Sequence, residues 1–477
     1  MATVNADSKV NLLEQAQAAR ASSNWSLLIQ CLLTLILGEQ VSPASPDQPP
    51  VSESEPKQLF DLALGEKRHP RSQKTPPLEA DELKQVLDLA IEAFVLGDFQ
   101  ERWDIAKVFP RLGQSAIAPL ISILEDEDAD EELRWYAARI LGEFNHPAAL
   151  AALVELLKTV ESEELRAMAA AALGSIGSPA VASLTELLAQ ENTRLLAVRS
   201  LSHIRRSETI APLLNVVQDP IIDIRVAAIE ALSSFHDPRI PPVLLIALDD
   251  IAAPVRREAV IGLSFRADLQ SELDLVNRLS PRLYDFNVEV CCSAAIALSR
   301  LGTDAAAAPL FQVLMSPHTP MKLQIEIIRS LSWLGTLTGL EYLRSCLQQS
   351  SVTVCQEIVT VLGRVEQPNL RGLAVEILIE MLQSDHPATE YPSVKQAIAL
   401  SLSQLGDVRA IAPLIQLLAD VDTGVRLHVI TALKQLDSET AHRQLEQMAV
   451  ASALAPDLKQ GVQIALAEWQ VAFSSPS

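Results

Sequence analysis

The apolar residues of this chain recur with helical spacing, in blocks of similar length along most of the sequence. One block runs from Glu164 to Gly177 and is typical of a short helix that ends at a glycine. If Arg166 is taken as the anchor of that block, equivalent anchor positions follow at intervals of 28 to 40 residues. The twelve anchor positions are Arg102, Arg134, Arg166, Arg194, Arg225, Arg256, Cys291, Gln324, Cys355, Lys395, Arg426 and Lys459. A period of this length predicts a repeat architecture.

Three apolar offsets accompany every anchor. The residue at −1 is apolar except at Glu101 and Thr193, and the residue at +3 is always Ala, Ile or Val. The residue at +7 is always large and apolar, from Phe109 in the first block to Leu466 in the last. Offsets of −1, +3 and +7 lie on one face of a helix. The pattern therefore predicts twelve amphipathic anchor helices.

A second apolar helix is expected after each anchor helix, often with proline near its start. The prolines at this place are Pro119, Pro212, Pro309 and Pro413. In the first turn of a helix, proline costs no hydrogen bond, because that amide has no helical partner. One helix pair cannot bury both apolar faces alone, so neighbouring pairs must stack. The prediction is an all-α fold, an α-solenoid of about twelve helical-hairpin repeats, with a concave groove lined by the second helices.

An aspartate stands six residues before several anchors, at Asp128, Asp219, Asp250, Asp285 and Asp420. Asp, then Arg, then Ala, then Leu-Gly resembles the HEAT repeat, over roughly residues 82 to 475. In particular it resembles the HEAT-like class of cyanobacterial phycobilin-lyase proteins. Stacking would bring the anchor of one repeat near the aspartate of the next. We therefore expect a ladder of charge-assisted hydrogen bonds that holds the turns in register.

The resemblance carries two functional implications. The class includes a HEAT-repeat protein that associates with the A-type iron–sulfur scaffold IscA. This implies a non-catalytic protein-interaction scaffold or adaptor that regulates iron–sulfur or iron homeostasis through a protein partner in the concave groove. The alternative is a phycobilin lyase subunit, or a chaperone for bilin attachment to phycobiliproteins, which would make the chain an enzyme of bilin-lyase type. The chain has more repeats than a typical lyase subunit, which counts against the alternative.

Three regions are expected along the chain. Residues 1–40 are predicted to form a helical hairpin, residues 41–80 a Pro/Ser-rich linker with eight prolines, and residues 81–477 the solenoid. Within the linker, residues 57–68 are amphipathic; they would pack back on the repeats or serve as a docking motif. The long interval between Cys355 and Lys395 indicates an insertion, with residues 385–392 as the extra loop. Such loops often serve binding.

The charge of the chain narrows its partners. The 477 residues carry a formal net charge of −22, which argues against nucleic acid and against an anionic membrane surface as partners. No membrane insertion is expected either. The most apolar run, Trp25 to Leu37, is shorter than the roughly 20 residues that span a bilayer. No signal peptide is recognised, and five cysteines lack framework spacing, so a cytoplasmic location is expected. The acidic run from Glu125 to Glu132 is expected to be a solvated turn; the alternative is a contact for a basic partner.

The cysteines offer the main candidate chemistry. Cys291 and Cys355 replace the anchor cation two repeats apart, roughly 20 Å, so they cannot share one metal ion. Buried free thiols are expected for both and for Cys292, and metal or bilin attachment there is the alternative. Cys346 lies across a turn from Cys355, but two further ligands would be needed for a metal site.

No motif for catalysis is found. The eight histidines are dispersed, without a His-Glu dipeptide, a Gly-rich phosphate loop or a Cys-x-x-Cys motif. We therefore predict no catalytic residue, no cofactor and no metal site. Three tryptophans lie near anchors, at Trp103, Trp135 and Trp333, and are expected to be packed; exposure for binding is the alternative.

Overall fold

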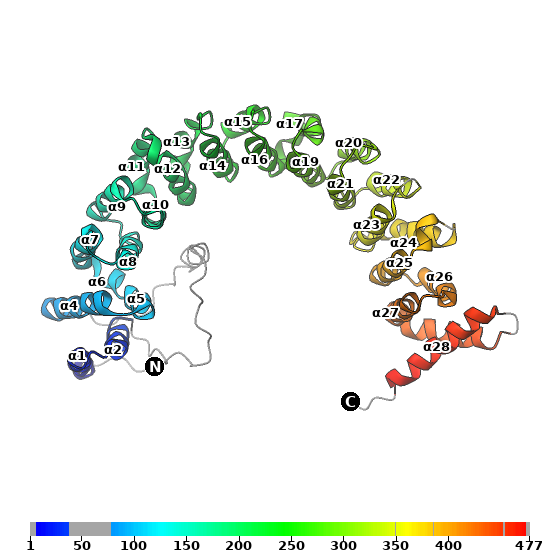
Figure 1. The fold of residues 1–477 in the computed structure, drawn as a ribbon, viewed down its shortest axis with the longest axis horizontal. Helices are drawn as coiled ribbons and strands as arrows, with labels where there is room; N and C mark the ends of the chain where they lie inside the picture. The colour runs from blue at the N-terminus through cyan, green and yellow to red at the C-terminus, as the bar shows by residue number, and fades with distance from the viewer. Residues whose placement is uncertain (1–5, 38–77, 349, 385, 452–453, 474–477) are drawn as a thin grey trace. The chain divides into compact units, whose positions relative to one another are not determined.

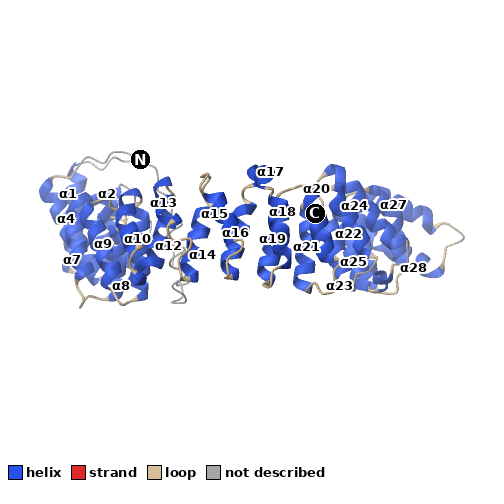
Figure 2. Cartoon of the chain, turned by 90° about the horizontal axis from the view of Figure 1, so that it is seen from above, coloured by secondary structure: helices blue, strands red, loops and turns tan. Residues whose placement is uncertain are grey.

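The computed structural model describes residues 6–37, 78–348, 350–384, 386–451 and 454–473 (Figure 1). Regular structure in these ranges is helical throughout, without a strand, so the predicted all-α class is confirmed (Figure 2). The chain divides into two compact units, Met1–Phe235 and His236–Ser477, which are described separately. The amphipathic residues 57–68 and most of the predicted linker lie outside the described residues.

Unit 1 stacks its helices in two rows (Figure 1). The anchor row contains α5 (Phe99–Ala106), α8 (Glu131–Leu141), α10 (Glu163–Ile176), α12 (Glu191–Ile204) and α14 (Ile222–Ser233). The second row contains α4 (Ala80–Leu96), α7 (Ile117–Glu125), α9 (Pro147–Thr159), α11 (Val181–Leu187) and α13 (Ile210–Leu214). Short helices join the rows: α6 (Phe109–Leu112), η1 (Gly113–Ala116), η2 (Ser178–Ala180) and η3 (Ser207–Thr209).

Unit 2 repeats the arrangement. Its anchor row contains α16 (Ala253–Ser264), α19 (Val288–Arg300), α21 (Met321–Trp333), α23 (Val352–Leu362), α25 (Pro392–Leu405), the first half of α27 (Thr423–Ala449) and α28 (Pro456–Phe473). The second row contains α15 (Ile240–Ala247), α17 (Gln270–Leu273), α18 (Leu275–Leu279), α20 (Asp304–Leu314), α22 (Leu337–Leu347), α24 (Pro368–Gln383) and α26 (Ile411–Gln416). The short connectors are η4 (Ala267–Leu269), η5 (Ser280–Tyr284), η6 (Pro387–Glu390), η7 (Val408–Ala410) and η8 (Leu417–Ala419).

The anchor helices form the inner, concave row within each unit, and the second helices form the outer row (Figure 1). The predicted groove lined by second helices is therefore wrong. The physical reason is small residues where anchor helices meet. A Cβ on Gly142 would lie 2.8 Å from Cα of Ala172, and one on Gly363 would lie 2.6 Å from Cβ of Ser401. Such close approach on one side of a stack bends it toward that side.

The apolar seam predicted from the anchor offsets is present. All twelve residues at +3 are buried, and so are eleven of the twelve at +7, with Leu466 partly exposed. Leu173 and Leu298, for example, are 0% exposed. Each buried leucine stabilises the folded state by about 1.5–3 kcal/mol relative to an exposed one. The seam, repeated along each unit, is the main source of cohesion.

The first repeat departs from the predicted continuous anchor helix. Helix α5 ends at Ala106, four residues before Pro110, because a proline ring clashes with the carbonyl four residues earlier. Phe109 is still buried, but from the separate helix α6. Pro309 also differs from expectation, since it lies inside α20 rather than in its first turn.

Unit 1 is covered at its N-terminal end and unit 2 at its C-terminal end. Helices α1 (Ala6–Ala21) and α2 (Trp25–Leu37) form the predicted hairpin, and α2 packs on α4 and α5. The guanidinium of Arg20 lies 2.6 Å from the Glu92 carboxylate at this contact. At the other end, α28 packs on α27, and Trp469 is 2% exposed. The two helical pairs therefore act as caps, while the three-region division of the chain stays a prediction.

None of the described helices combines the length and the apolarity needed to cross a bilayer by itself. A bent pair, Glu163–Ile176 with Ser178–Leu187, meets the requirement on length and composition only. Both helices bury leucines in the stack of unit 1, including Leu173 and Leu184.

Candidate protein-interaction surface

The anchor cations form the predicted ladder with the aspartate of the next repeat. Nη1 of Arg194 lies 2.7 Å from Oδ2 of Asp219. In unit 2, Arg256 donates to both carboxylate oxygens of Asp285, at 2.7 and 2.6 Å. Lys395 makes the same contact with Asp420. The ladder is therefore confirmed at these steps.

The first step of the ladder uses other carboxylates than the one predicted. Arg102 pairs with Asp130 and Glu132, each at 2.9 Å, and not with Asp128. Asp130 and Glu132 belong to the acidic run that was expected to be only a solvated turn. Part of that run therefore contributes to the ladder, while Asp126 and Asp128 remain exposed.

Each ladder aspartate also fixes its own turn. Oδ1 of Asp285 accepts a hydrogen bond from the Asn287 amide at 2.9 Å. The backbone carbonyl of Asp285 accepts a hydrogen bond from Sγ of Cys291 at 3.2 Å. Burial raises the pKa of the Asp285 carboxyl, but the hydrogen bonds from Arg256 and Asn287 and the Arg256 charge outweigh burial and leave the pKa below its usual range. The ladder residues are thus fully engaged in structure.

The cysteines are buried, free thiols, as expected. Burial raises the pKa of Cys292 to about 11 and that of Cys346 to about 12, so both remain protonated at neutral pH. A metal ligand or a nucleophile requires the thiolate form. Among the described residues, no group of three or more His, Cys, Asp or Glu side chains is placed to hold a metal ion.

The predicted insertion loop is tied to the core. His386 is buried, and its Nε2 lies 2.8 Å from the Leu347 carbonyl while its Nδ1 accepts from the Ala388 amide. Tyr391, at the end of this segment, is 51% exposed. The loop therefore presents one aromatic side chain from an anchored backbone.

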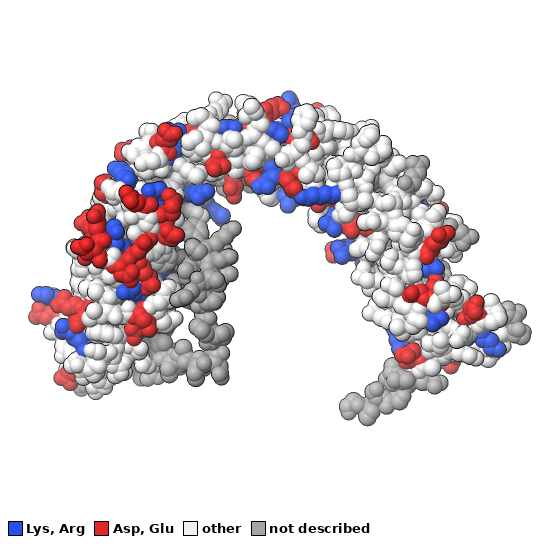
Figure 3. Space-filling model, in the orientation of Figure 1, with Lys and Arg blue, Asp and Glu red and all other residues white. Residues whose placement is uncertain are grey.

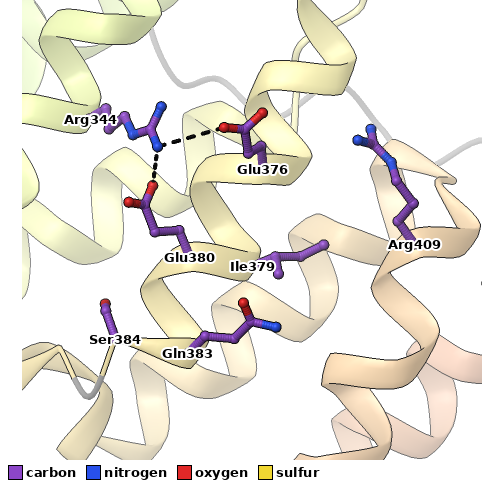
Figure 4. A pocket seen from close by; sticks show the side chains of 7 residues that line it. All are labelled: Arg344, Glu376, Ile379, Glu380, Gln383, Ser384 and Arg409. Atoms are coloured by element: carbon purple, nitrogen blue, oxygen red, sulfur yellow. Dashed lines mark ion pairs between the residues drawn. The ribbon is translucent and has the colours of Figure 1, made fainter.

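A cavity of about 420 Å³ in unit 2 lies between outer helices (Figure 4). Its lining residues are Arg344, Glu376, Ile379, Glu380, Gln383, Ser384 and Arg409. Arg344 pairs with Glu380 at 2.5 Å and with Glu376 at 3.6 Å, so the charges largely satisfy each other. Ile379 is the single large apolar side chain in the lining, whereas small-molecule sites are mostly apolar.

A second cavity of about 420 Å³ lies on the inner row of unit 1, between α12 and α14. Its lining residues are Arg199, Ser202, His203, Arg205, Asp223, Val226, Ala227, Glu230, Ala231 and Ser234. Burial and the Arg205 charge lower the pKa of His203, so this imidazole is neutral at pH 7. The lining combines small apolar side chains with side chains of both charges, which suits a protein contact better than an enclosed ligand.

At offset +9 from the anchor, the inner-row helices carry residues that are exposed and that differ from repeat to repeat. These residues follow the seam leucine by two, at the C-terminal ends of the anchor helices. In ten successive repeats they are Glu143, Ser175, His203, Ser234, Phe265, Arg300, Trp333, Arg364, Gln404 and Gln435, and all ten are exposed. We call this set the +9 row. All members of the +9 row are exposed and their side chains differ in chemical type, whereas the residues at +3 and +7 are apolar in every repeat.

Aromatic and cationic side chains alternate in the middle of the +9 row, within unit 2. Phe265 is 55% exposed and Trp333 is 66% exposed, so the expectation that Trp333 is packed is wrong. Trp103 and Trp135, by contrast, are partly buried in an aromatic cluster of unit 1. Lys and Arg side chains gather along the inner edge over α16, α19 and α21, and acidic side chains gather over α7 to α10 (Figure 3).

Several solved structures resemble this chain in fold. The complex of Kap95p, the yeast importin-β, with Nup1 matches with a TM-score of 0.50 and 13% identity, over 98% of this chain and 67% of Kap95p. Kap121p bound to Pho4p matches with a TM-score of 0.51 and 15% identity, over 87% of this chain and 52% of Kap121p. Kap95p from its complex with RanGDP also matches, with 66% of the Kap95p chain covered. No curated protein matches the chain in sequence.

The sequence itself matches the family model of HEAT repeats at residues 117–194, 189–264 and 375–467. These segments cover just over half of the chain and span both units. With the two-row stack, the seam and the ladder, they show that the chain belongs to the HEAT-repeat family.

Proposed function

We propose that the chain is a non-catalytic scaffold that holds a protein partner on its inner row. The observation that supports this most is the +9 row, which is exposed in ten successive repeats and differs in chemistry from repeat to repeat. Positions that only hold the stack together are alike in every repeat. An exposed series with varied side chains is what recognition of one particular partner requires.

Two further features support a binding role. The recurring polar residues, such as Arg256 and Asp285, are committed to the ladder, and the thiols are buried and protonated. Related stacks bind proteins: Kap95p forms a complex with Nup1, and Kap121p is bound to Pho4p. Extended contact along a concave row is the common mode for solenoids.

The finer roles rest on the sequence resemblance alone. The first is regulation of iron–sulfur or iron homeostasis through a protein partner, as for the IscA-associating HEAT-repeat protein. The second is a phycobilin lyase subunit or chaperone, as in the cyanobacterial class. The buried free thiols suit a reducing compartment, so we place the scaffold in the cytoplasm.

Affinity capture from the source cells tests the scaffold. The full chain, tagged at one end, is used as bait and bound proteins are identified by mass spectrometry. We expect at least one partner in stoichiometric amount, and changing Trp333 and Arg364 to alanine asks separately whether these two residues of the +9 row contact it. Arg344→Ala, on the outer helix α22, is the matched control and should retain the partner. Repeated capture without a stoichiometric partner would contradict the proposal.

The two finer roles separate in the same system. A partner that carries or assembles iron–sulfur clusters supports the first. Co-expression with bilin and an apo-phycobiliprotein tests the second, and a coloured covalent adduct is the expected result for a lyase. Absence of colour together with a non-phycobiliprotein partner would remove the lyase role and leave the scaffold.

A further inference from the structure

Four successive members of the +9 row form an alternating series of aromatic and cationic side chains. They are Phe265, Arg300, Trp333 and Arg364, at the C-terminal ends of α16, α19, α21 and α23. All four lie in unit 2, and their helices pack in that order. In this series the Trp333 indole has one guanidinium group on each side, from Arg300 in the preceding repeat and from Arg364 in the following repeat.

The first pair is held in place before any partner arrives. Cζ of Arg300 lies 5.0 Å from the ring centroid of Phe265, a cation–π distance. Nη1 of Arg300 also donates to Oγ of Ser264 at 3.0 Å. Arg300 forms no ion pair with a described carboxylate, so its remaining donors face solvent. An ordered guanidinium with free donors binds carboxylates at low entropic cost.

The second pair has no partner within the part of the chain that the structure describes. The exposed guanidinium of Arg364 makes neither an ion pair nor a hydrogen bond there, and nearby Glu366 does not pair with it. The indole of Trp333 is 66% exposed, and it has no stacking, cation–π or hydrogen-bond partner among the described side chains. In a chain of net charge −22, two cations without carboxylates beside an uncovered indole indicate an external anionic partner.

We propose that these four residues bind an extended, acidic segment of the partner protein. Successive helices lie roughly 10 Å apart, and an extended chain advances roughly 3.3 Å per residue, so each repeat spans about three residues. Arg300 and Arg364 are two repeats apart, which matches carboxylates about six residues apart in the partner. An apolar or aromatic residue midway between them would pack on Trp333. This inference rests on the proposed scaffold function and adds the chemistry of the partner.

A peptide selection tests the proposal directly. The full chain is immobilised and a random nonapeptide display library is selected against it. We expect peptides with two Asp or Glu residues about six apart and an apolar or aromatic residue between them. Arg364→Ala and Trp333→Ala should each weaken a selected peptide at least tenfold, whereas Arg344→Ala on the outer row should not. Binding should weaken with added salt, because exposed charges are screened.

Three outcomes of the peptide selection would overturn the proposal. They are the selection of basic peptides, the selection of none, and selected peptides that bind the Trp333→Ala and Arg364→Ala variants as tightly as the unchanged chain. A labelled uridine decamer is tested in parallel, because aromatic rings and arginines also bind single-stranded RNA. Decamer binding that is lost in Trp333→Ala would assign the row to RNA instead. Capture of the natural partner by the variants would overturn this inference while leaving the scaffold function intact.

Discussion

Two groups of aromatic side chains, one in each unit, are placed in opposite ways. In unit 1 the rings form a core: Phe94 lies 5.3 Å from Phe109 and 6.4 Å from Tyr136, measured between ring centroids. Tyr136 is 0% exposed. In unit 2 the rings of Phe265 and Trp333 lie at the C-terminal ends of inner-row helices and are more than half exposed.

The frame around these rings is the same in both units. Each has the apolar seam, the close approach of small residues between anchor helices, and an anchor cation paired with the next aspartate. The HEAT repeat therefore constrains the residue type at a few offsets and leaves it free at others. Aromatic residues on the seam side stabilise unit 1, and aromatic residues at +9 are available to a partner in unit 2.

The largest difference is expected when one aromatic residue in each unit is replaced by alanine. Tyr136→Ala should lower the free energy of unfolding by about 3–5 kcal/mol, because it leaves a large cavity among packed rings. Trp333→Ala should change it by less than about 0.5 kcal/mol, as is usual at exposed positions. Urea unfolding followed by circular dichroism measures both. Equal losses for the two variants would contradict the division of roles.

Removing a ladder carboxylate should have the next largest effect. Asp285→Ala leaves the mostly buried Arg256 guanidinium unpaired and should cost about 3 kcal/mol. Asp219→Ala, which breaks the pair with Arg194, is the counterpart in unit 1 and should cost a similar amount. If either substitution proves neutral in urea unfolding, the ladder does not hold that unit together.

The same ladder predicts a pH dependence. Because the pKa of Asp285 is lowered in the folded chain, its contribution to stability is present above the unfolded pKa of about 3.9. That contribution is lost as the pH falls through the lower, folded pKa. The unfolding midpoint should therefore drop as the pH falls below about 4, and it should drop less for Asp285→Asn. Identical pH profiles for the unchanged chain and for Asp285→Asn would exclude a contribution of the Asp285 carboxylate to the pH dependence.

Adding a methyl group between anchor helices should have an intermediate effect in both units. Gly142→Ala and Gly363→Ala each place a Cβ under 3 Å from the next anchor helix, and overpacking of this kind costs about 1–3 kcal/mol. Gly113→Ala is a useful contrast, because its positive φ strains the backbone without a steric contact. Thermal unfolding ranks the three, and stabilisation by Gly363→Ala would contradict the close approach.

The last prediction concerns the reactivity of the buried cysteine thiols, which does not change the free energy of unfolding. With pKa values of about 11 for Cys292 and about 12 for Cys346, the folded chain should react with a disulfide reagent at pH 8 far more slowly than the urea-unfolded chain. All five cysteines should react after unfolding. Rapid labelling of Cys292 in the folded chain would reopen its role as a reactive site.

The periodic features were predictable from the sequence, because seam residues and ladder charges recur at constant offsets. Residues such as Leu298 and the pair Arg194–Asp219 follow from that periodicity. The curvature was not predictable in the same way, since it depends on how closely Gly363 and Ser401 approach. The break at Pro110 had a visible signal, a proline eight residues after the anchor.

The +9 row was missed because it lies outside the apolar stripe that defines the repeat. Trp333 was expected to be packed, as an isolated tryptophan usually is. Aligning the repeats at their anchors and reading the offset +9 across them places Phe265, Arg300, Trp333 and Arg364 in one column. That column is the signal that periodicity of apolar residues alone does not reveal.

The most direct test measures partner capture and stability on the same variant. For Trp333→Ala, we expect an unfolding midpoint in urea close to that of the unchanged chain and capture of the natural partner reduced at least tenfold. A midpoint lowered as far as that of Tyr136→Ala, with partner capture unchanged, would contradict a binding role for Trp333.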